Sequence, residues 1–305
     1  RAGVLSKLTN EQADEAWVAQ LSSPHPAAVF RAIKALGDTS VSEPLVTILS
    51  DTDEHPLIRA AVAAALGQQR RSDLLLVQAK VSHDRVRWAV IQALGRGVDG
   101  AALPVLERAF RTDKNPDIRR AAMKSVKALS PKRGAALARK ALGDSYGALA
   151  REASSILGEH GELSDVSRLV SLKMRSTIRT SGVRAAAKIV RRSDKGGARD
   201  AAATRITGVL VRMLDDVDFR ARQSAVSLLG SVGDKSAISH LERFRRIETV
   251  DELTQAAREA VSNIRSRGDD LEEAGQDNET AAKLKDLETR IDEMEDQFQS
   301  WMDQH

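Results

Sequence analysis

A repeating segment runs through most of the 305 residues, and this repeat restricts the folds available to the chain more than any other feature. Each copy opens with an apolar residue, usually followed by Arg, continues through small and apolar residues, and closes near Gly. Gly37, Gly67 and Gly95 mark the period, because they are 30 and 28 residues apart. The clearest copies are Ile58–Gly67, Val86–Gly95 and Ala221–Gly230, and weaker copies start at Ala28, Ile118, Leu149 and Val183.

The spacing within each copy is that of an amphipathic helix. Apolar and small residues fall at positions i, i+3, i+4 and i+7, which places them on one buried face. A second apolar helix is predicted between copies, for example over residues 41–49, 101–110 and 237–244. Asp, Asn and Pro in the turns suit the N-cap and the first turn of the helix that follows. The Gly that closes each copy suits a left-handed C-terminal cap.

The unit is therefore an apolar helix, a short turn with Asp, and a helix that opens with an apolar residue and Arg. This unit resembles the HEAT repeat, in particular the short variety named after phycobilisome lyases. The resemblance implies an all-α, right-handed α-solenoid of about eight HEAT-like helix pairs over residues 1–267. In HEAT proteins the helices with the Arg motif line a long concave surface. The register stays open where Ile178-Arg179 and Val183-Arg184 both fit the motif.

The motif arginines have two alternative roles. In HEAT proteins the equivalent Arg usually bonds the turn Asp of a neighbouring unit, which predicts a structural ladder. The alternative is a row of side chains that bind an anion. The residues concerned are Arg59, Arg87, Arg119 and Arg222, with Asp53, Asp84, Asp117 and Asp218 as the expected acids.

Other basic residues lie off the predicted buried face. Residues 1–267 hold 44 basic and 30 acidic side chains, a net charge of +14. On a concave surface such residues would form an electropositive track for a partner, although a solvated helix face is the alternative explanation. The candidate partner-binding residues are Lys34, Arg96, Arg120, Lys124, Lys127, Lys188, Arg191 and Arg192.

The last segment has a different composition, with 13 acidic and 3 basic residues from 268 to 305. The composition of residues 268–280 predicts an acidic flexible linker. The pattern of residues 281–305 predicts a coiled-coil helix, because the apolar residues there are alternately three and four positions apart, as in an a/d seam. The seam residues, assigned to oligomerisation, are Leu284, Leu287, Ile291, Met294, Phe298 and Trp301. Pairing of Lys283 with Glu288 and of Arg290 with Glu295 favours a parallel homodimer, and packing on the solenoid is the alternative.

Catalytic and metal-binding patterns are missing from the sequence. Without Cys there are no disulfides or thiolate sites, and the six His residues lack metal-ligand spacing. The segment Gly95–Gly100 matches the glycine pattern of dinucleotide-binding proteins, but it follows a predicted helix rather than a strand. We therefore expect no enzyme activity and no cofactor. The absence of a long apolar stretch and of a signal-peptide pattern predicts a soluble, cytoplasmic protein that does not contact a membrane.

Three functions are compatible with these features. The favoured one is a non-catalytic protein–protein interaction scaffold that holds a partner, acidic in character, on the concave solenoid surface and self-associates through the coiled coil. The second is binding of nucleic acid or another polyanion, against which stand the few aromatic residues available for stacking, 3% of the chain. The third is an accessory domain of a larger zinc aminopeptidase. A final HEAT unit, an acidic break and a heptad helix resemble the carboxyl-terminal region of aminopeptidase-N-type enzymes, although a His-Glu-x-x-His motif is missing here.

Overall fold

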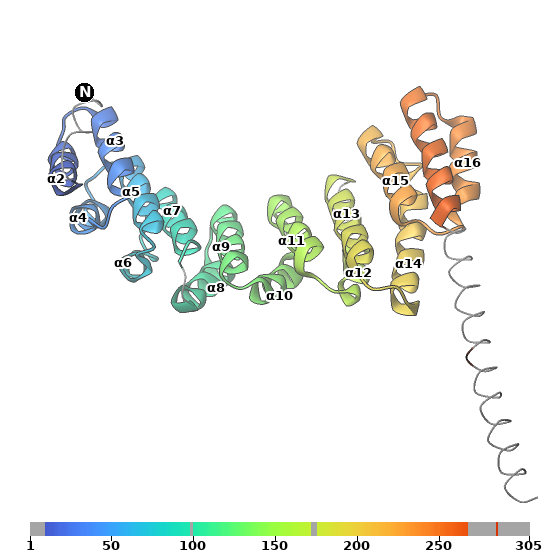
Figure 1. The fold of residues 1–305 in the computed structure, drawn as a ribbon, viewed down its shortest axis with the longest axis horizontal. Coiled ribbons are helices and arrows are strands. Elements are labelled where there is room, and N and C mark those ends of the chain that lie inside the picture. Colours follow the sequence, from blue (N-terminus) through green and yellow to red (C-terminus); the bar gives the residue numbers. More distant parts are fainter. Residues whose placement is uncertain (1–9, 98–99, 172–175, 268–284, 286–305) are drawn as a thin grey trace, which may run out of the picture. The chain divides into compact units, whose positions relative to one another are not determined.

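The computed structural model describes residues 10–97, 100–171, 176–267 and 285, and its regular elements are helices (Figure 1). Within these residues there is no β-strand, which confirms the all-α prediction. The chain divides into two compact units, Arg1–Ile189 and Val190–His305. The predicted linker over 268–280 and the predicted coiled-coil seam over 284–301 lie outside the described residues, apart from Lys285.

In the first unit the helices follow one another in pairs (Figure 1). The first helices of these pairs are α2 (Asn10–Gln20), α4 (Glu43–Ser50), α6 (Ser72–Val77), α8 (Leu103–Thr112), α10 (Pro131–Ala141) and α12 (Leu163–Val170). The second helices are α3 (Pro26–Leu36), α5 (Pro56–Gln68), α7 (Asp84–Leu94), α9 (Pro116–Leu129), α11 (Gly147–His160) and α13 (Ser176–Arg192). A short 3-10 helix, η1 (Gly100–Ala102), leads into α8.

The second unit begins within α13 and adds two further pairs. The first consists of α14 (Gly197–Met213) and α15 (Phe219–Val232). The second consists of α16 (Ala237–Ile247) and a helix over residues 251–267. The described helices thus form eight consecutive pairs, as the repeat predicted.

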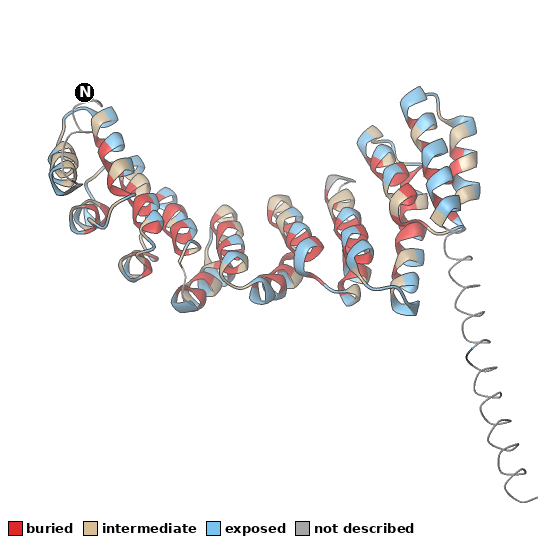
Figure 2. Ribbon diagram, viewed as in Figure 1, coloured by how far each residue is buried: buried red, intermediate tan, exposed pale blue. Residues whose placement is uncertain are grey.

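The second helices pack against one another along the first unit: α3 against α5, α5 against α7, α7 against α9, and α9 against α11. Their facing sides are the buried surfaces in Figure 2. Leu36, Leu66 and Leu94 are 0% exposed, and burial of such a side chain contributes about 2 kcal/mol. Because the packing joins neighbours in sequence, the core is a row of small clusters rather than one central core.

Turn residues cap the second helices, as predicted for Asp and Asn. Asn115 and Asp218 each accept the backbone N–H of the residue two positions further on, at 2.9 Å. His55 and His83 make the same bond through Nδ1, at 3.2 Å. These bonds satisfy N–H groups that the first helical turn leaves open. Two of the histidines therefore have a structural role in helix capping.

The glycines that close the copies are not left-handed caps, and that prediction was wrong. Gly37 and Gly95 have φ angles of −60° and −69°, in the right-handed region. Gly67, Gly158 and Gly230 lie inside their helices, before the last residue. The reason for glycine at these positions lies in helix packing rather than in helix termination.

At these positions the next second helix packs against the glycine backbone. A Cβ atom at residue 67 would lie 2.8 Å from Ala93 Cα, which is too close for an ordinary contact. A side chain there would force the two pairs apart. In α9 the arrangement is reversed, because Lys127 occupies the glycine position and Gly134 of α10 lies against the backbone of Lys127.

The same contact fixes the register of the sixth copy. In the third and fourth copies, the residue that meets the preceding glycine lies seven residues after the start of the copy. Gly158 meets Ala185, which lies seven residues after Ile178. The sixth copy therefore starts at Ile178 rather than at Val183, and the copy at Ala221 follows 43 residues later.

Candidate binding surfaces

An ion-pair ladder links the turns of successive pairs. Arg87 of α7 donates through Nε to Asp113 Oδ2 at 2.7 Å and through Nη2 to Asp84 Oδ1 at 2.7 Å. The hydrogen bond to Asp113 is the main reason why the pKa of the Arg87 guanidinium is raised. Arg119 lies 3.3 Å from Asp144 of the following turn. The structural role predicted for the motif arginines is confirmed at these positions.

The partner acids differ from the predicted ones. Each partner lies three residues before the next second helix begins. In the second unit this residue is Glu248, which accepts a hydrogen bond from Arg222 Nε at 3.0 Å. Val81 stands at the corresponding position after α5, so Arg59 donates instead to the carbonyl of Leu49 at 3.1 Å. Turn register, rather than the presence of Asp in the turn, decides which acid is used.

The four acids expected in the ladder have other surroundings. Asp84 bonds the motif Arg of its own unit. Asp117 accepts a hydrogen bond from the Tyr146 hydroxyl at 3.0 Å, and Asp218 caps α15. Asp53 is exposed.

A further ion pair joins two first helices and was not predicted from the sequence. Arg139 of α10 donates through Nε and Nη2 to the two carboxylate oxygens of Asp165 in α12, at 2.7 and 2.8 Å. Burial opposes the charge on Asp165, which is 3% exposed. The bonds from Arg139 and from the Glu162 N–H nevertheless hold the pKa of Asp165 below its ordinary value.

Exposed apolar side chains form a hollow on the second helices of the first unit. Leu57 of α5 is 42% exposed and Trp88 of α7 is 40% exposed. With Ala60 they line an open hollow of about 490 Å³. Single exposed apolar side chains are normal on a protein surface, but apolar side chains that gather in a hollow are a common feature of binding sites.

The rim of this hollow is polar, and its groups bond one another. Asn115 Nδ2 donates to Asp84 Oδ2 at 2.7 Å. Asp117, which also lines the hollow, accepts from Tyr146 and lies 3.1 Å from Arg120 Nη2. Because the rim acids already have donors, the apolar floor is the part of the hollow that a partner would use.

The predicted basic residues fall mostly on the second helices of the first unit. Their positions are Lys34 on α3, Arg96 just after α7, Arg120, Lys124 and Lys127 on α9, Lys188 on α13, and Arg191 and Arg192 at the C-terminal end of α13, in the second unit. Glu159 of α11 interacts with basic residues of both α9 and α13. It accepts a hydrogen bond from Lys127 Nζ at 2.7 Å, and this bond, with a smaller effect of Lys188, lowers the pKa of Glu159. Among the described residues no hydrogen bond or ion pair joins Lys34 to this cluster. Arg151, which is exposed on α11, was not predicted from the sequence.

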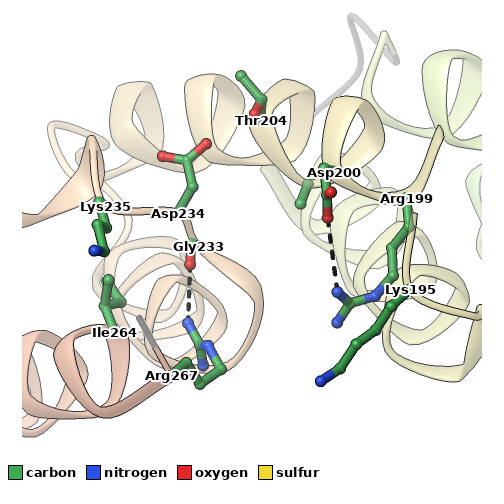
Figure 3. Close-up of a pocket in the computed structure, with 10 residues that line it drawn as sticks. Lys195, Arg199, Asp200, Thr204, Gly233, Asp234, Lys235, Ile264 and Arg267 are labelled. Carbon is green, nitrogen blue, oxygen red and sulfur yellow. Dashed lines mark hydrogen bonds and ion pairs between the residues drawn. The ribbon is translucent and has the colours of Figure 1, made fainter. Parts of the chain in front are cut away.

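The second unit has a pocket of about 470 Å³ between the start of α14, the turn after α15 and the end of the helix over 251–267 (Figure 3). Its charged lining residues are Lys195, Arg199, Asp200, Asp234, Lys235 and Arg267. The sequence analysis did not predict this pocket, because its walls come from three segments far apart in the chain. The Gly196-Gly197 pair at the start of α14 is the sequence feature that could have indicated it.

Paired helices, stacked second helices and an Arg–acid ladder together describe a helical repeat array. The family model described as HEAT repeats matches residues 72–158. Residues 72–158 are therefore similar to HEAT repeats. The match runs from α6 into α11, and the remaining HEAT-like pairs have the same order of first and second helices.

Similarity to solved structures extends over most of the chain. An engineered protein has a TM-score of 0.50 at 19% sequence identity, with 86% of this chain and 80% of that chain covered. The Escherichia coli protein YibA has a TM-score of 0.56 at 15% identity, with 85% of this chain and 94% of that chain covered. At these identities the likeness shows the HEAT-like fold alone. No curated protein matches the sequence.

The described residues, 10–97, 100–171, 176–267 and 285, offer neither a metal site nor a membrane-spanning helix. No group of three or more His, Asp or Glu there is placed to hold a metal ion. No helix in the same part of the chain is long and apolar enough to cross a membrane. Gly95 ends α7, so the dinucleotide-like glycine pattern follows a helix, as predicted.

Proposed function

We propose that this HEAT repeat chain is a non-catalytic scaffold that binds a protein partner on the second-helix face of its first unit. This face comprises the exposed side of α5, α7 and α9 and is defined here by Leu57, Trp88, Arg120, Lys124 and Lys127. Arrays of helical repeats commonly bind proteins on such extended surfaces. The observation that carries the proposal is the apolar hollow at Trp88 beside the basic residues of α9.

The chemistry of this face favours an acidic partner with a large apolar side chain. Trp88 presents an exposed aromatic surface, and aromatic anchors in hollows supply much of the energy of protein interfaces. Lys124 is exposed on the next second helix, and basic residues there steer acidic segments toward the hollow. The partner would place its apolar side chain on Leu57 and Trp88 and its carboxylates along α9.

A selection from a library of random peptides tests this proposal. The full chain is immobilised, and bound peptides are sequenced and measured by fluorescence anisotropy. We expect enrichment of peptides that combine Asp or Glu with one aromatic or Leu residue. Trp88→Ala should weaken them by about tenfold or more, the effect of a hot-spot residue. Lys124→Glu should weaken them and flatten the dependence on salt.

Lys140→Glu is the matched control, because Lys140 is exposed on α10, a first helix outside the proposed face. It should leave peptide affinity unchanged. Selected peptides that keep their affinity for both Trp88→Ala and Lys124→Glu would place the binding surface elsewhere.

Nucleic-acid binding is the second candidate function. The observation that favours it is the presence of exposed basic side chains on α9, α11 and α13. Lys127 already pairs with Glu159, which reduces the charge available to phosphates. Duplex and single-stranded DNA should be titrated at low salt against the chain and its double variant Lys124→Glu, Lys127→Glu. A weaker and less salt-dependent affinity of the variant would support this function, and no binding by the parent chain would exclude it.

Self-association is a proposal that depends on the predicted seam from Leu284 to Trp301. Its 3,4 spacing suits a parallel helix dimer, in which the linker would let two HEAT bodies act together on one partner. Light scattering during size exclusion should give about twice the chain mass. Ile291→Asp, or a chain that ends at Arg267, should run as a monomer. A monomeric parent chain whose melting temperature falls in Ile291→Asp would instead mean that the seam packs on the HEAT body.

The accessory role in a zinc aminopeptidase stays a prediction, because it depends on the order of the final HEAT unit, the linker and the seam. A His-Glu-x-x-His motif encoded upstream of residue 1 in the same gene would favour it. The proposed partner surface would then act beside a catalytic domain instead of in a separate scaffold.

A further inference from the structure

The pocket of the second unit has an excess of positive charge. Basic residues among its lining outnumber acidic ones by four to two: Lys195, Arg199, Lys235 and Arg267 against Asp200 and Asp234. Figure 3 shows Lys195 and Arg199 on one side of the pocket and Arg267 on the opposite side. A volume of about 470 Å³ is in the range of small-molecule sites.

Arg267 is held in place but keeps donors for a ligand. Its Nη1 and Nη2 donate to the carbonyls of Gly230 and Gly233 at the C-terminal end of α15, the second at 2.8 Å. A guanidinium has five N–H groups, so three remain after these bonds. Burial, and then the charge of Arg199, lower the pKa of Arg267. Its surroundings therefore disfavour the charged guanidinium, and a bound anion would stabilise that charge.

The opposite wall has a second guanidinium that is only weakly neutralised. Arg199 Nε donates to the carbonyl of Val190 at 3.1 Å, while its Nη1 is 3.8 Å from Asp200 Oδ1, beyond hydrogen-bond distance. The Asp200 side chain is 71% exposed, and ion pairs this exposed are weak. Lys195 precedes Gly196, whose φ of +153° favours glycine and sets the direction of the chain into α14.

The rest of the lining is mainly apolar and includes Ala203 and Ile264. We propose that this pocket binds a small organic anion, a carboxylate or phosphate ester with an apolar body, whose charged group lies between Arg199 and Arg267. The apolar body would lie against Ala203 and Ile264. Such a ligand would link the start of α14 to the end of α15 and to the last described helix. This site is a different activity from the partner binding proposed for the first unit.

Phenyl phosphate is a suitable probe, because it joins a dianionic group to an apolar ring. Its binding to the full chain at low salt is measured by isothermal titration calorimetry and by saturation-transfer NMR of the ring protons. We expect one saturable site, weaker binding of inorganic phosphate and no binding of benzyl alcohol. Arg199→Gln should weaken phenyl phosphate about tenfold, because it removes a charge-assisted hydrogen bond. Asp200→Asn should strengthen it, because it removes a competing negative charge.

Arg212→Gln is the matched control, since Arg212 is exposed on α14 but does not line the pocket. It should change the affinity by less than about twofold, the scale of general charge effects. Circular dichroism of each variant checks that the helices remain. Three results would overturn the proposal: no saturation at low salt, equal binding of benzyl alcohol, or an equal loss in Arg212→Gln and Arg199→Gln.

Discussion

The two units contain the same kind of helix pair but at different spacing. In the first unit the copies follow one another at steps of 28 to 32 residues, starting at Ala28, Ile58, Val86, Ile118, Leu149 and Ile178. The step from Ile178 to Ala221 is 43 residues, and the second unit begins within it, at Val190. The added length is found in α13 and α14, which have 17 residues each.

This difference has a consequence for binding. Short, regular steps place second helices against the preceding glycine, except at α9, and leave exposed residues on successive second helices, which suits an extended partner. The longer step gives α14 a first turn that is largely exposed, and the pocket is lined from this turn. Regular repetition therefore favours an extended surface, whereas the one longer step is accompanied by a concave pocket, which we propose to be a small-ligand site.

The largest expected effect is a loss of stability that is confined to the first unit. Leu66→Asp puts an ionised group into the packing of α5 against α7 and should cost about 4 kcal/mol. Hydrogen exchange followed by mass spectrometry should show faster exchange in α5 and α7 and unchanged exchange in α14 and α15. Ala89→Asp, also in a buried position, should act in the same way.

Ala64→Asp is the control for this prediction, because Ala64 is exposed on the same helix as Leu66. It should leave exchange unchanged. If α14 and α15 exchange faster in Leu66→Asp, the two units unfold together and the comparison between them fails.

Glycine substitutions should have opposite effects in the two units. Gly67→Val adds atoms where a Cβ alone would lie 2.8 Å from Ala93 Cα, and should cost about 3 kcal/mol through overpacking. Gly208 of α14 has open space around it, so Gly208→Ala should stabilise the second unit by about 1 kcal/mol through higher helix propensity. Thermal denaturation of both variants measures the difference. A stable Gly67→Val would show that the pairs do not need this close approach.

The ladder should contribute to both units alike. Arg87→Ala leaves Asp113, whose side chain is 8% exposed, without its main partner and should cost about 2 kcal/mol. Arg222→Ala should cost a similar amount, because Glu248 is equally buried. Arg71→Ala, at an exposed pair, should cost about 0.5 kcal/mol or less. Melting temperatures that order the three variants differently would mean that the ladder is not the same in the two units.

The smallest effect concerns acid stability of the first unit. The pKa of Asp165 is lower in the folded chain than in the unfolded chain. Its charge therefore stabilises the fold above about pH 4, and this contribution is lost as the pH falls through the lower, folded value. Asp165→Asn should reduce the slope of melting temperature against pH in the acid range. An unchanged slope would assign the acid sensitivity to other carboxylates.

The helix pairs were predictable from the sequence because the apolar period of each copy requires one buried face, and only a neighbouring pair can cover it. The ladder was predictable in kind from the motif arginines. The acids of the ladder could not be predicted. Glu248 and Asp144 are used because they lie three residues before the next second helix, and this position is not set by the presence of Asp in the turn.

Two other features could not be derived from the residue pattern. A glycine near a helix end suits a left-handed cap and a close helix contact equally well, and only the position of Ala93 distinguishes them. The pocket requires Arg199 and Arg267 to face one another, although 68 positions separate them in the chain. That relation depends on how three helices pack, which a repeat period does not specify.

The glycine contact also bears on how such an array can change length during evolution. Gly67 meets Ala93 and Gly95 meets Ser125, so one kind of interface accepts either small residue. Loss or duplication of the α6–α7 pair would join surfaces that already match. At α9 the glycine is exchanged for Lys127, with Gly134 opposite, so a pair inserted after α9 would meet a surface shaped for another neighbour. By this contact alone, a pair is more easily lost or gained before α9 than directly after it.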